Sequence, residues 1–393
     1  MQAFDPSQIV EILNGVLRRN GRDVALHEPH FGGREWDYLK DCLDSGWVSS
    51  AGAYVERFER ELAALCEAPY AIAVVNGTAA LQVALLLAGV GRDDEVLVPT
   101  LTFVATANAV AHCGAVPHFC DSATDTLGLD PEKLDSYLGE IAELRDGACR
   151  NKASGRRIAA VMAMHTFGHP VDLDALAEVA ARWKLPLVED AAEALGSRYK
   201  GRHVGRHGLL AALSFNGNKI VTTGGGGALL THDPALAKAA RHLTTTAKLP
   251  HRWAFDHDRV GFNYRLPNLN AALGVAQLEQ LPALLAAKRR LAERYLQAFA
   301  QVPGVVPFRE PRFAESNYWL NALLLDPALA GRRDDLLAAT NDAGILARPA
   351  WTAMHALPMY RDCPRMDLSV AEDLVRRIVN LPSSPVLGGL DGA

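Results

Sequence analysis

Short apolar runs alternate with longer helix-like segments along the chain from about residue 70. The runs are rich in β-branched residues and span 71–75, 95–99, 115–119, 157–165 and 185–190. Strands that alternate with helices favour a mostly parallel sheet with helices on both faces, which is an α/β fold. Ligands of such sheets bind beyond the carboxyl ends of the strands, where loops enter the helices.

The pattern changes after Gly227. The sequence then predicts helices over 234–243 and 268–300, followed by shorter mixed elements up to Leu381. We also expect a helical segment at 191–195, directly after the last apolar run of the first half.

These patterns predict three parts of the chain. Residues 1–25 form an N-terminal helix that packs on the body, 26–249 a large α/β domain, and 250–393 a smaller C-terminal α+β domain. The apolar residues of the N-terminal helix lie on one helical face, and they are Ile9, Leu13, Val16 and Leu17.

Composition limits the class of protein. Hydrophobic residues make up 49% and charged residues 22% of the 393 residues, which is typical of a folded globular protein. The net charge of −5 gives no basic face, so we expect no nucleic-acid partner. The longest apolar stretch, around 79–90, contains Gln82 and is too short to span a bilayer, so we expect no membrane segment.

Neither the cysteines nor the first residues indicate export. The six cysteines form no CxxC pair, so we expect them to be reduced. The N-terminal residues place acids ahead of apolar positions, unlike a secretory signal peptide. The sequence therefore predicts a cytoplasmic protein.

Some charged and histidine-containing stretches carry little functional signal. HEPH at 27–30 lacks the HExxH spacing, and His165 with His169 lies in a Gly-Pro loop, so we expect no metal site. The basic stretch 145–157 lacks periodicity and is interpreted as a solvated loop.

Polar residues follow several of the predicted strands. Asn76, Gly77 and Thr78 lie at a strand-to-helix turn, where free amides attract anions, although a simple helix cap is the more common reason for these residues at such a turn. Asp190 ends the run at 185–190, where it either caps the next helix or holds a proton on a heteroaromatic nitrogen.

Lys219 stands between short polar residues and the glycines at 224–227. The order is wrong for a P-loop, in which the glycines come before the lysine. Most lysines are surface residues, but burial lowers the pKa of an amine and makes it nucleophilic. Ser214 precedes Lys219, and Phe103 follows the run at 95–99 as either a core aromatic or a ring that stacks on a planar ligand.

Together these residues are the parts that a pyridoxal phosphate enzyme needs. Such an enzyme requires an anion cup, an acid for the pyridine nitrogen and a lysine that forms a Schiff base. The stretches around Gly77, Asp190 and Lys219 supply one part each.

The same stretches carry a resemblance to a known family. The chain resembles the DegT/StrS-type nucleotide-sugar aminotransferases, a branch of the fold-type I pyridoxal phosphate enzymes, from about Leu26 to Ser384. The motifs that carry the resemblance are NGTAAL (76–81), PTLTFVATANA (99–109), EDAAEALGS (189–197), SFNGNKIVTTGGGG (214–227) and GFNYRLPNLNAALG (261–274).

The resemblance implies catalytic and ring-binding roles. It makes Lys219 the lysine that binds the cofactor and transfers protons, and Asp190 the partner of the pyridine nitrogen. Phe103 would stack on the ring, and Glu193 would lie near the cofactor.

It also implies a phosphate site and a partner subunit. Gly77, Thr78 and Ser214 would hold the cofactor phosphate. Asn263 would reach the phosphate of the neighbouring subunit, which implies a homodimer with shared active sites.

A narrower resemblance is to the 4-aminotransferases of the legionaminic acid and bacillosamine routes. It rests on LHEPHFGG (26–33), WVSSAGAYVERFE (47–59), LTTTAKLPHRW (243–253), NYWLNALLL (317–325) and RPAWTAMHALPMY (348–360). The implied substrate is a nucleotide-linked 4-keto-6-deoxyhexosamine, in UDP-linked and N-acetylated form, used for bacterial surface glycans. The implied donor is glutamate, with pyridoxamine phosphate as the intermediate form of the cofactor.

The narrower resemblance also supplies candidate substrate contacts. They are Ser49, Ser50, Asn317 and His355, each of which is explained equally well as a cap or a surface residue. The family commonly has Glu where this chain has Gly225, so no role of that acid is carried over.

Two other functions fit parts of this pattern. A pyridoxal phosphate-dependent sugar dehydratase or lyase would use the same pocket, but related dehydratases have a histidine in place of the lysine, so Lys219 favours amino transfer. A dinucleotide-binding or sensory module would explain the glycine run, but the chain has no GxGxxG turn after its first predicted strand.

Overall fold

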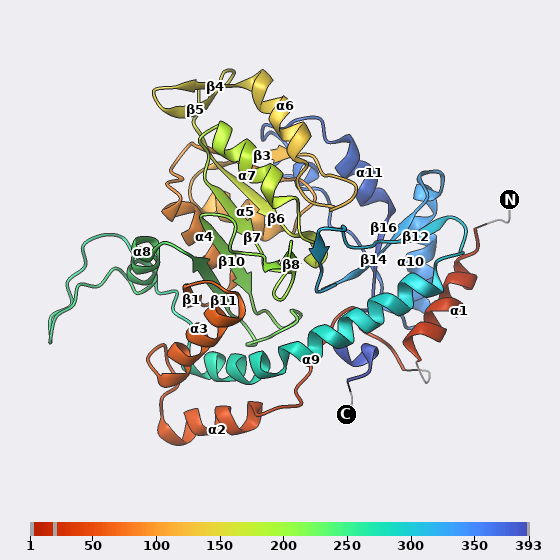
Figure 1. Ribbon diagram of the computed structural model, residues 1–393, viewed down its shortest axis with the longest axis horizontal. Helices are drawn as coiled ribbons and strands as arrows, with labels where there is room; N and C mark the ends of the chain where they lie inside the picture. The colour runs from red at the N-terminus through yellow and green to blue at the C-terminus, as the bar shows by residue number, and fades with distance from the viewer. Residues whose placement is uncertain (1–3, 19–21, 391–393) are drawn as a thin grey trace.

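The centre of the protein is a seven-stranded sheet in the order β1-β11-β10-β7-β6-β2-β3 (Figure 1). The computed structural model describes residues 4–18 and 22–390. In sheet order the strands are Tyr70–Val74, Gly227–Thr231, Leu210–Ser214, Leu187–Asp190, Ile158–Met164, Glu95–Pro99 and Val116–Cys120. β11 is antiparallel to both of its neighbours, and the other strand pairs are parallel. The predicted mostly parallel α/β fold is confirmed.

Helices cover both faces of the sheet. Successive strand residues point to opposite faces, so Val96 belongs to one hydrophobic cluster and Leu97 to another. The helices that pack in the cluster of Val96 are α4 (Gly77–Leu87), α5 (Val104–His112) and α8 (Pro234–Thr244). Those that pack in the cluster of Leu97 include α3 (Ala53–Leu65), α6 (Pro131–Ile141) and α7 (Leu173–Arg182). Because both faces are covered, β6 is buried along its whole length.

Several of these helices begin at a side chain that caps free backbone amides. Asn76 accepts a hydrogen bond from Ala79 N at the start of α4, and Asp172 caps α7 in the same way. Asp130 and Asp233 each cap a helix whose first residue is proline, which has no amide to satisfy. These residues fix where each strand-to-helix loop ends.

A smaller antiparallel sheet lies beside the large one. Its order is β12 (Val305–Pro307), β14 (Asn321–Leu325), β16 (Ile378–Leu381) and β15 (Arg348–Pro349). Around it lie α1 (Pro6–Leu17), α10 (Arg333–Asp342) and α11 (Ser369–Arg377) (Figure 1). The predicted apolar face of α1 is confirmed, because its residues Ile9, Leu13, Val16 and Leu17 are buried in the cluster of this sheet.

The helix α9 (Asn268–Ala298) connects the two sheets, as its long course in Figure 1 shows. Its first half contributes Val275 and Leu281 to the core under the large sheet. Its second half contributes Leu291 and Tyr295 to the core of the small sheet. The predicted domain boundary lies between residues 249 and 250, before α9. Since α9 packs in the cores of both sheets, it belongs to both parts of the protein.

The remaining elements are short. They are α2 (Glu35–Ser45), β4 (Ala142–Arg145), β5 (Ala148–Asn151), η1 (Thr166–Gly168), β8 (Arg198–Tyr199), β9 (Arg202–His203), β13 (Ala314–Glu315), η2 (Pro327–Arg332), η3 (Met354–Ala356) and η4 (Pro385–Gly388).

Two local predictions were wrong. Residues 191–195 form turns rather than a helix, because Asp190 takes the amide of Ala192 and Gly196 follows with a φ of 86°. The stretch 145–157 contains half of a β-hairpin, made by β4 and β5, rather than only a loop. Its turn is Asp146-Gly147, where both residues have positive φ, and this dipeptide favours the tight turn of a hairpin.

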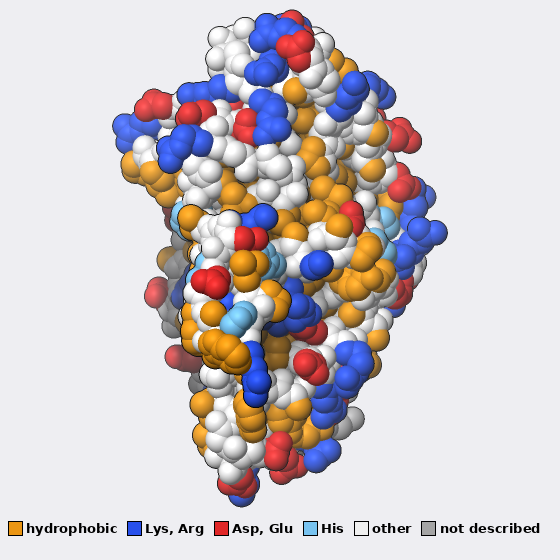
Figure 2. Space-filling model, turned by 90° about the vertical axis from the view of Figure 1, so that its left-hand side faces the viewer, with side chains coloured by type: hydrophobic (Ala, Val, Ile, Leu, Met, Phe, Trp, Pro, Cys, Tyr) orange, Lys and Arg blue, Asp and Glu red, His pale blue; other side chains and the backbone are white. Residues whose placement is uncertain are grey.

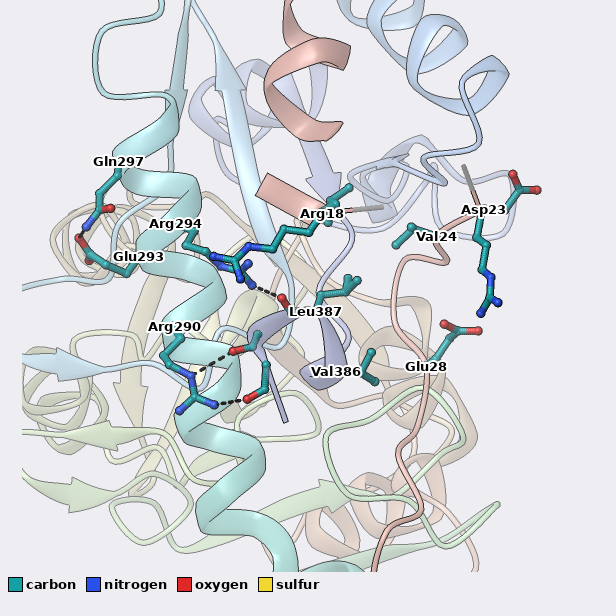
Figure 3. Close-up of a pocket in the computed structure, with 14 residues that line it drawn as sticks. Arg18, Asp23, Val24, Glu28, Arg290, Glu293, Arg294, Gln297, Val386 and Leu387 are labelled. Atoms are coloured by element: carbon teal, nitrogen blue, oxygen red, sulfur yellow. Dashed lines mark hydrogen bonds between the residues drawn. The ribbon is translucent and has the colours of Figure 1, made fainter. Parts of the chain in front are cut away.

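A cavity of about 1070 Å³ lies between α9, residues 22–28 and η4 (Figure 3). Arginines of α9 line it and donate hydrogen bonds to backbone carbonyls of α1, of η4 and of the residue that follows η4. Arg290 donates to the carbonyls of Gly388 and Gly389 at 3.0 and 2.7 Å, and Arg294 donates to those of Val16 and Leu387. This cavity contains none of the predicted site residues.

Within the described residues, no helix combines the length and apolarity needed to cross a membrane. The cysteines are free thiols, and four of them are buried in the hydrophobic cores.

The carboxylate of Glu189 in β7 is fully buried and anchors the loop that precedes β10. It accepts hydrogen bonds from the amides of Gly205, His207 and Gly208 at 2.6–2.7 Å, and His165 Nε2 lies 3.2 Å away. Burial alone would raise the pKa of Glu189, but His165 and the amides lower it to about 2. The folded state therefore holds this group ionised.

We predict that Glu189→Gln destabilises the protein by about 2–4 kcal/mol at pH 7, because a neutral amide accepts these bonds more weakly. A folded pKa of about 2 against 4.5 means that the contribution is complete above pH 4.5 and is lost as the pH falls toward 2. The difference between variant and wild type should therefore shrink over that range.

Urea unfolding followed by circular dichroism at several pH values measures this difference. Glu178→Gln, at an exposed position of α7, is the matched control and should behave like the wild type. If the difference in unfolding free energy between Glu189→Gln and the wild type stayed constant down to pH 3, the ionised state assigned to Glu189 would be wrong.

Candidate active site

A cavity of about 250 Å³ lies at the carboxyl ends of β7 and β10, next to the start of α4. It brings together seven of the predicted site residues, which are Gly77, Thr78, Phe103, Asp190, Glu193, Ser214 and Lys219. The parallel strands place their carboxyl ends at one edge of the sheet, which is why segments far apart in the sequence meet here.

One end of the cavity is suited to an anion. Asn76 caps Ala79 N, so the amides of Gly77 and Thr78, the first two helical residues, are left without an intrahelical acceptor. A Cβ at position 77 would lie 2.9 Å from Ser214 Cβ, so the close approach of β10 requires glycine there. The amides, the Ser214 hydroxyl and the dipole of α4 form a cradle for a phosphate.

The wall at the end of β7 contains the buried carboxylate of Asp190. Thr106 Oγ1 donates to Asp190 Oδ2 at 2.7 Å, and Ala192 N donates to Oδ1 at 3.2 Å. Burial raises the pKa of Asp190, and the hydrogen bond from Thr106 acts against this rise. These bonds fix the direction of the carboxylate within the cavity.

Lys219 Nζ lies between an acid and an aromatic ring. It is 3.4 Å from Glu193 Oε1 and 3.9 Å from the centre of the Trp319 ring. The other oxygen of Glu193 accepts a hydrogen bond from Phe167 N at 2.9 Å. Burial raises the pKa of Glu193 to about 7, so its carboxyl group exchanges a proton near neutral pH.

Aromatic rings form the remaining walls. Phe103 is 47% exposed and borders the cavity, where it packs edge-on against Trp351 at 6.1 Å. Trp351 in turn lies 4.9 Å from the ring of Phe167. Phe103 is therefore not a core residue, and its exposed face is available to a planar ligand.

Three of the predicted residues lie on the surface, outside this cavity. Asn263 is exposed and bridges to Thr245 in the segment that follows α8. Ser49 and Ser50 are exposed, and the carbonyl of Ser49 accepts a hydrogen bond from Asn268 N. In one subunit these residues do not border the cavity.

Asn317 and His355 also lie outside the cavity. The amide of Asn317 donates to the carbonyls of Glu193 and Leu195, both at 2.9 Å, and it accepts from Trp319 N. His355 lies in a separate cavity of about 460 Å³, where its Nδ1 is 2.8 Å from Thr100 Oγ1. The Asn317 contacts favour a positioning role, because its hydrogen-bonding groups are used within the protein.

The structure adds residues that the sequence did not single out. Thr106 orients Asp190, Trp319 covers Lys219, and Trp351 closes the wall beside Phe103. A single sequence gives no signal that separates these side chains from ordinary core residues. Among the described residues, no group of three or more His, Cys, Asp or Glu side chains is arranged to hold a metal ion.

The residues present fit pyridoxal phosphate. The cradle at Gly77 suits its phosphate, the buried carboxylate of Asp190 suits a protonated pyridine nitrogen, and Phe103 offers a ring face. Lys219 lies in the same cavity, with its amine 3.4 Å from Glu193 Oε1. The fold and this site define a pyridoxal phosphate-dependent enzyme of the fold-type I aminotransferase class.

Comparisons with known proteins agree with this class. The chain belongs to the DegT/DnrJ/EryC1/StrS aminotransferase family, whose model matches residues 29–391. A GDP-perosamine synthase of Escherichia coli O157:H7 is 36% identical over 364 residues, covering 93% of this chain and 94% of that protein. A putative pyridoxal phosphate-dependent aminotransferase, EpsN of Bacillus subtilis, is 37% identical and covers 92% of this chain and 91% of its own length.

A solved structure shows the same fold. The aminotransferase TlmJ from Streptoalloteichus hindustanus superposes with a TM-score of 0.82 at 30% identity, covering 92% of this chain and 93% of that one. The protein is therefore a pyridoxal phosphate-dependent nucleotide-sugar aminotransferase. The names of these relatives support the family but not the narrower likeness to the legionaminic acid and bacillosamine enzymes.

We predict that Thr106→Val lowers kcat about tenfold, because loss of one hydrogen bond to a charged group costs about 1.5 kcal/mol or more. Without this bond the pKa of Asp190 should rise further. The acidic limb of the kcat profile should then move to higher pH.

A pH series of kcat measures this shift. Thr340→Val removes another buried threonine hydroxyl, in α10, and is the matched control for stability. An unchanged acidic limb in Thr106→Val would contradict the role given to this hydroxyl.

Proposed function

We propose that the enzyme moves an amino group from an amino acid, with glutamate as the donor, to C4 of a nucleotide-linked 4-keto-6-deoxyhexose. The observation that carries this proposal is Lys219, whose amine lies beside buried acids in a cavity suited to the cofactor. The family supports a nucleotide sugar as the acceptor. The amino sugar would serve bacterial surface-glycan synthesis.

The name of a relative changes which nucleotide we expect on the sugar substrate. The Escherichia coli relative carries the name GDP-perosamine synthase, and perosamine is a 4-amino-4,6-dideoxyhexose. This name supports amino transfer at C4. It favours a GDP-linked substrate over the UDP-linked, N-acetylated sugar that the motifs implied.

The phosphate cradle and the walls would hold the cofactor. Gly77, Thr78 and Ser214 would bind its phosphate, Phe103 would cover one ring face, and Asp190 would keep a proton on the ring nitrogen. When bound, pyridoxal phosphate supplies an electron sink for the amino-acid α-carbon.

Lys219 would act as the acid and base. Its Nζ takes the proton from the α-carbon of the donor and, in the second half-reaction, delivers a proton to C4 of the sugar. Glu193, 3.4 Å away, holds a proton near neutral pH and can exchange it with the amine. Trp319 covers the amine and excludes water from this path.

We further propose that the active enzyme is a homodimer with shared active sites. The segment 249–260 after α8 extends from the body of one subunit (Figure 1) and exposes large hydrophobic side chains. Trp253 is 72%, Phe255 76% and Val260 87% exposed. The face seen in Figure 2, on the side of α8, shows hydrophobic side chains among basic and acidic ones. Asn263 follows this segment and lies outside its own cavity, which fits a contact with a neighbouring subunit.

We predict that the double substitution Trp253→Ser and Phe255→Ser weakens the dimer, because exposed aromatic rings are typical anchors of interfaces. Light scattering after gel filtration should show a shift toward monomer, together with reduced activity. Met359→Ser, at a position that is 59% exposed, is the matched control. A double variant that stays dimeric and fully active would contradict the proposed interface.

The amino transfer itself is tested with ¹⁵N-glutamate and GDP-, UDP- and TDP-linked 4-keto-6-deoxyhexoses. We expect ¹⁵N at C4 of the sugar product, with the GDP-linked substrate giving the highest kcat/KM. Lys219→Ala should form no amino sugar, because no other side chain replaces its amine. A deoxygenated or cleaved product without nitrogen would show a dehydratase or lyase instead.

A further inference from the structure

Lys288 is a fully buried lysine in the second half of α9, and it does not border the cavity of Lys219. In the part of the chain that the structure describes, no carboxylate forms an ion pair with its amine. Burial of an ammonium group without such a partner costs free energy, whereas methionine would fill the same space without that cost. The position therefore has a use for the hydrogen-bond donors of lysine.

The amine of Lys288 donates to two backbone carbonyls. They belong to Trp319, at 3.1 Å, and to Ser383, at 2.5 Å. Trp319 precedes β14 and Ser383 follows β16, so both carbonyls lie outside the strands of the small sheet. Burial lowers the pKa of Lys288 well below its usual value, and a neutral amine has two N–H groups, one for each carbonyl. Lys288 thus ties α9 to the segments beside these two strands.

The backbone that carries Trp319 is strained. Tyr318, directly before it, has a φ of 47°, which a residue with a side chain adopts only at a cost. Such a conformation persists where the surrounding contacts hold it. The amide of Trp319 donates to Asn317 Oδ1 at 2.8 Å, and its carbonyl accepts from Lys288. These two bonds hold the amide and the carbonyl of Trp319, and they limit the positions that its ring can take.

The ring of Trp319 shields the amine that carries out the chemistry. Its centre lies 3.9 Å from Lys219 Nζ, and its Nε1 donates to Asn218 O at 2.8 Å. The side chain of Lys219 is only 11% exposed. A shift of the ring would admit water to the amine and move it relative to a substrate, and rates depend steeply on such positions.

We propose that Lys288 is a positioning residue of the amino-transfer reaction. Its amine holds the carbonyl of Trp319, and the ring of Trp319 in turn keeps the amine of Lys219 covered and in place. This inference rests on the function proposed above, in which Lys219 is the acid and base. It requires that a change at Lys288 reaches Lys219 through the ring of Trp319.

The first test measures how fast acetic anhydride acetylates Lys219 in the apoenzyme, by mass spectrometry of its peptide. In Lys288→Met, which keeps the length of the side chain but removes its donors, this rate should rise severalfold because the Trp319 ring is no longer held. Lys288→Gln should restore part of the protection, since its amide keeps two N–H groups. Arg290→Met is the matched control on α9, because it removes donors to the carbonyls of residues 388–389 and should leave the rate unchanged.

The second test is a double-mutant cycle with Trp319→Ala, measured on kcat of the holoenzyme. In the wild-type background Lys288→Met should lower kcat about tenfold, with smaller changes in both KM values. In Trp319→Ala, which has no ring to position, Lys288→Met should change neither kcat nor the acetylation of Lys219 any further. A residue that only supports the fold would lower kcat by the same factor in both backgrounds. Thermal unfolding measures the loss of stability separately.

Each result separates the alternatives. Unchanged acetylation of Lys219 in folded Lys288→Met, or the same loss of kcat with and without the Trp319 ring, would overturn the positioning role. If Lys288→Met fails to fold, Lys288→Gln is taken through the same cycle. If the wild type moves no nitrogen onto any ketosugar, the proposed function fails instead. The acetylation experiment uses the apoenzyme and would still decide whether Lys288 keeps Lys219 covered.

Discussion

The buried acids at the end of β7 are the constraint on which the site depends. Glu189 and Asp190 are neighbours on one strand, so their side chains point to opposite faces of the sheet. A buried carboxylate without partners costs several kcal/mol, so each of them requires a set of donors. Glu189 is satisfied by His165 and by loop amides, which fixes the loop before β10. Asp190 is satisfied by Thr106, which fixes the start of α5 against β7.

Residues of the small sheet and its loops form the rest of the Lys219 cavity, and a second set of hydrogen bonds holds them in place. Asn317 joins the segment of Trp319 to the carbonyls beside Glu193. Lys288 of α9 is fully buried and donates to the carbonyls of Trp319 and Ser383, at 3.1 and 2.5 Å. The Trp319 ring also donates from its Nε1 to Asn218 O at 2.8 Å. Hydrogen bonds with Lys288, Asn317 and Asn218 thus hold Trp319 over the amine of Lys219.

The sequence predicted the parts of the structure that depend on local patterns. The alternation of apolar runs and helical segments predicted the order of strands and helices. The strand ends, together with the family resemblance, predicted seven residues that border one cavity. The segment 191–195 was wrong because a tertiary demand, the donor that Asp190 needs, overrides its helix-forming alanines. Trp319 was not assigned from local pattern, because its position follows from how the small sheet packs on the large one.

Trp319 is shared by two neighbouring cavities. Its ring lies 3.9 Å from the Lys219 amine and also lines a second cavity of about 390 Å³ together with His27. Lys288 and Asn317, both buried, bind the backbone of Trp319, and the backbone carbonyl of Asn218 accepts a hydrogen bond from its ring. A change at Lys288 or Asn317 would therefore alter both cavities together. The cover over the lysine thus depends on how the small sheet packs on the large one.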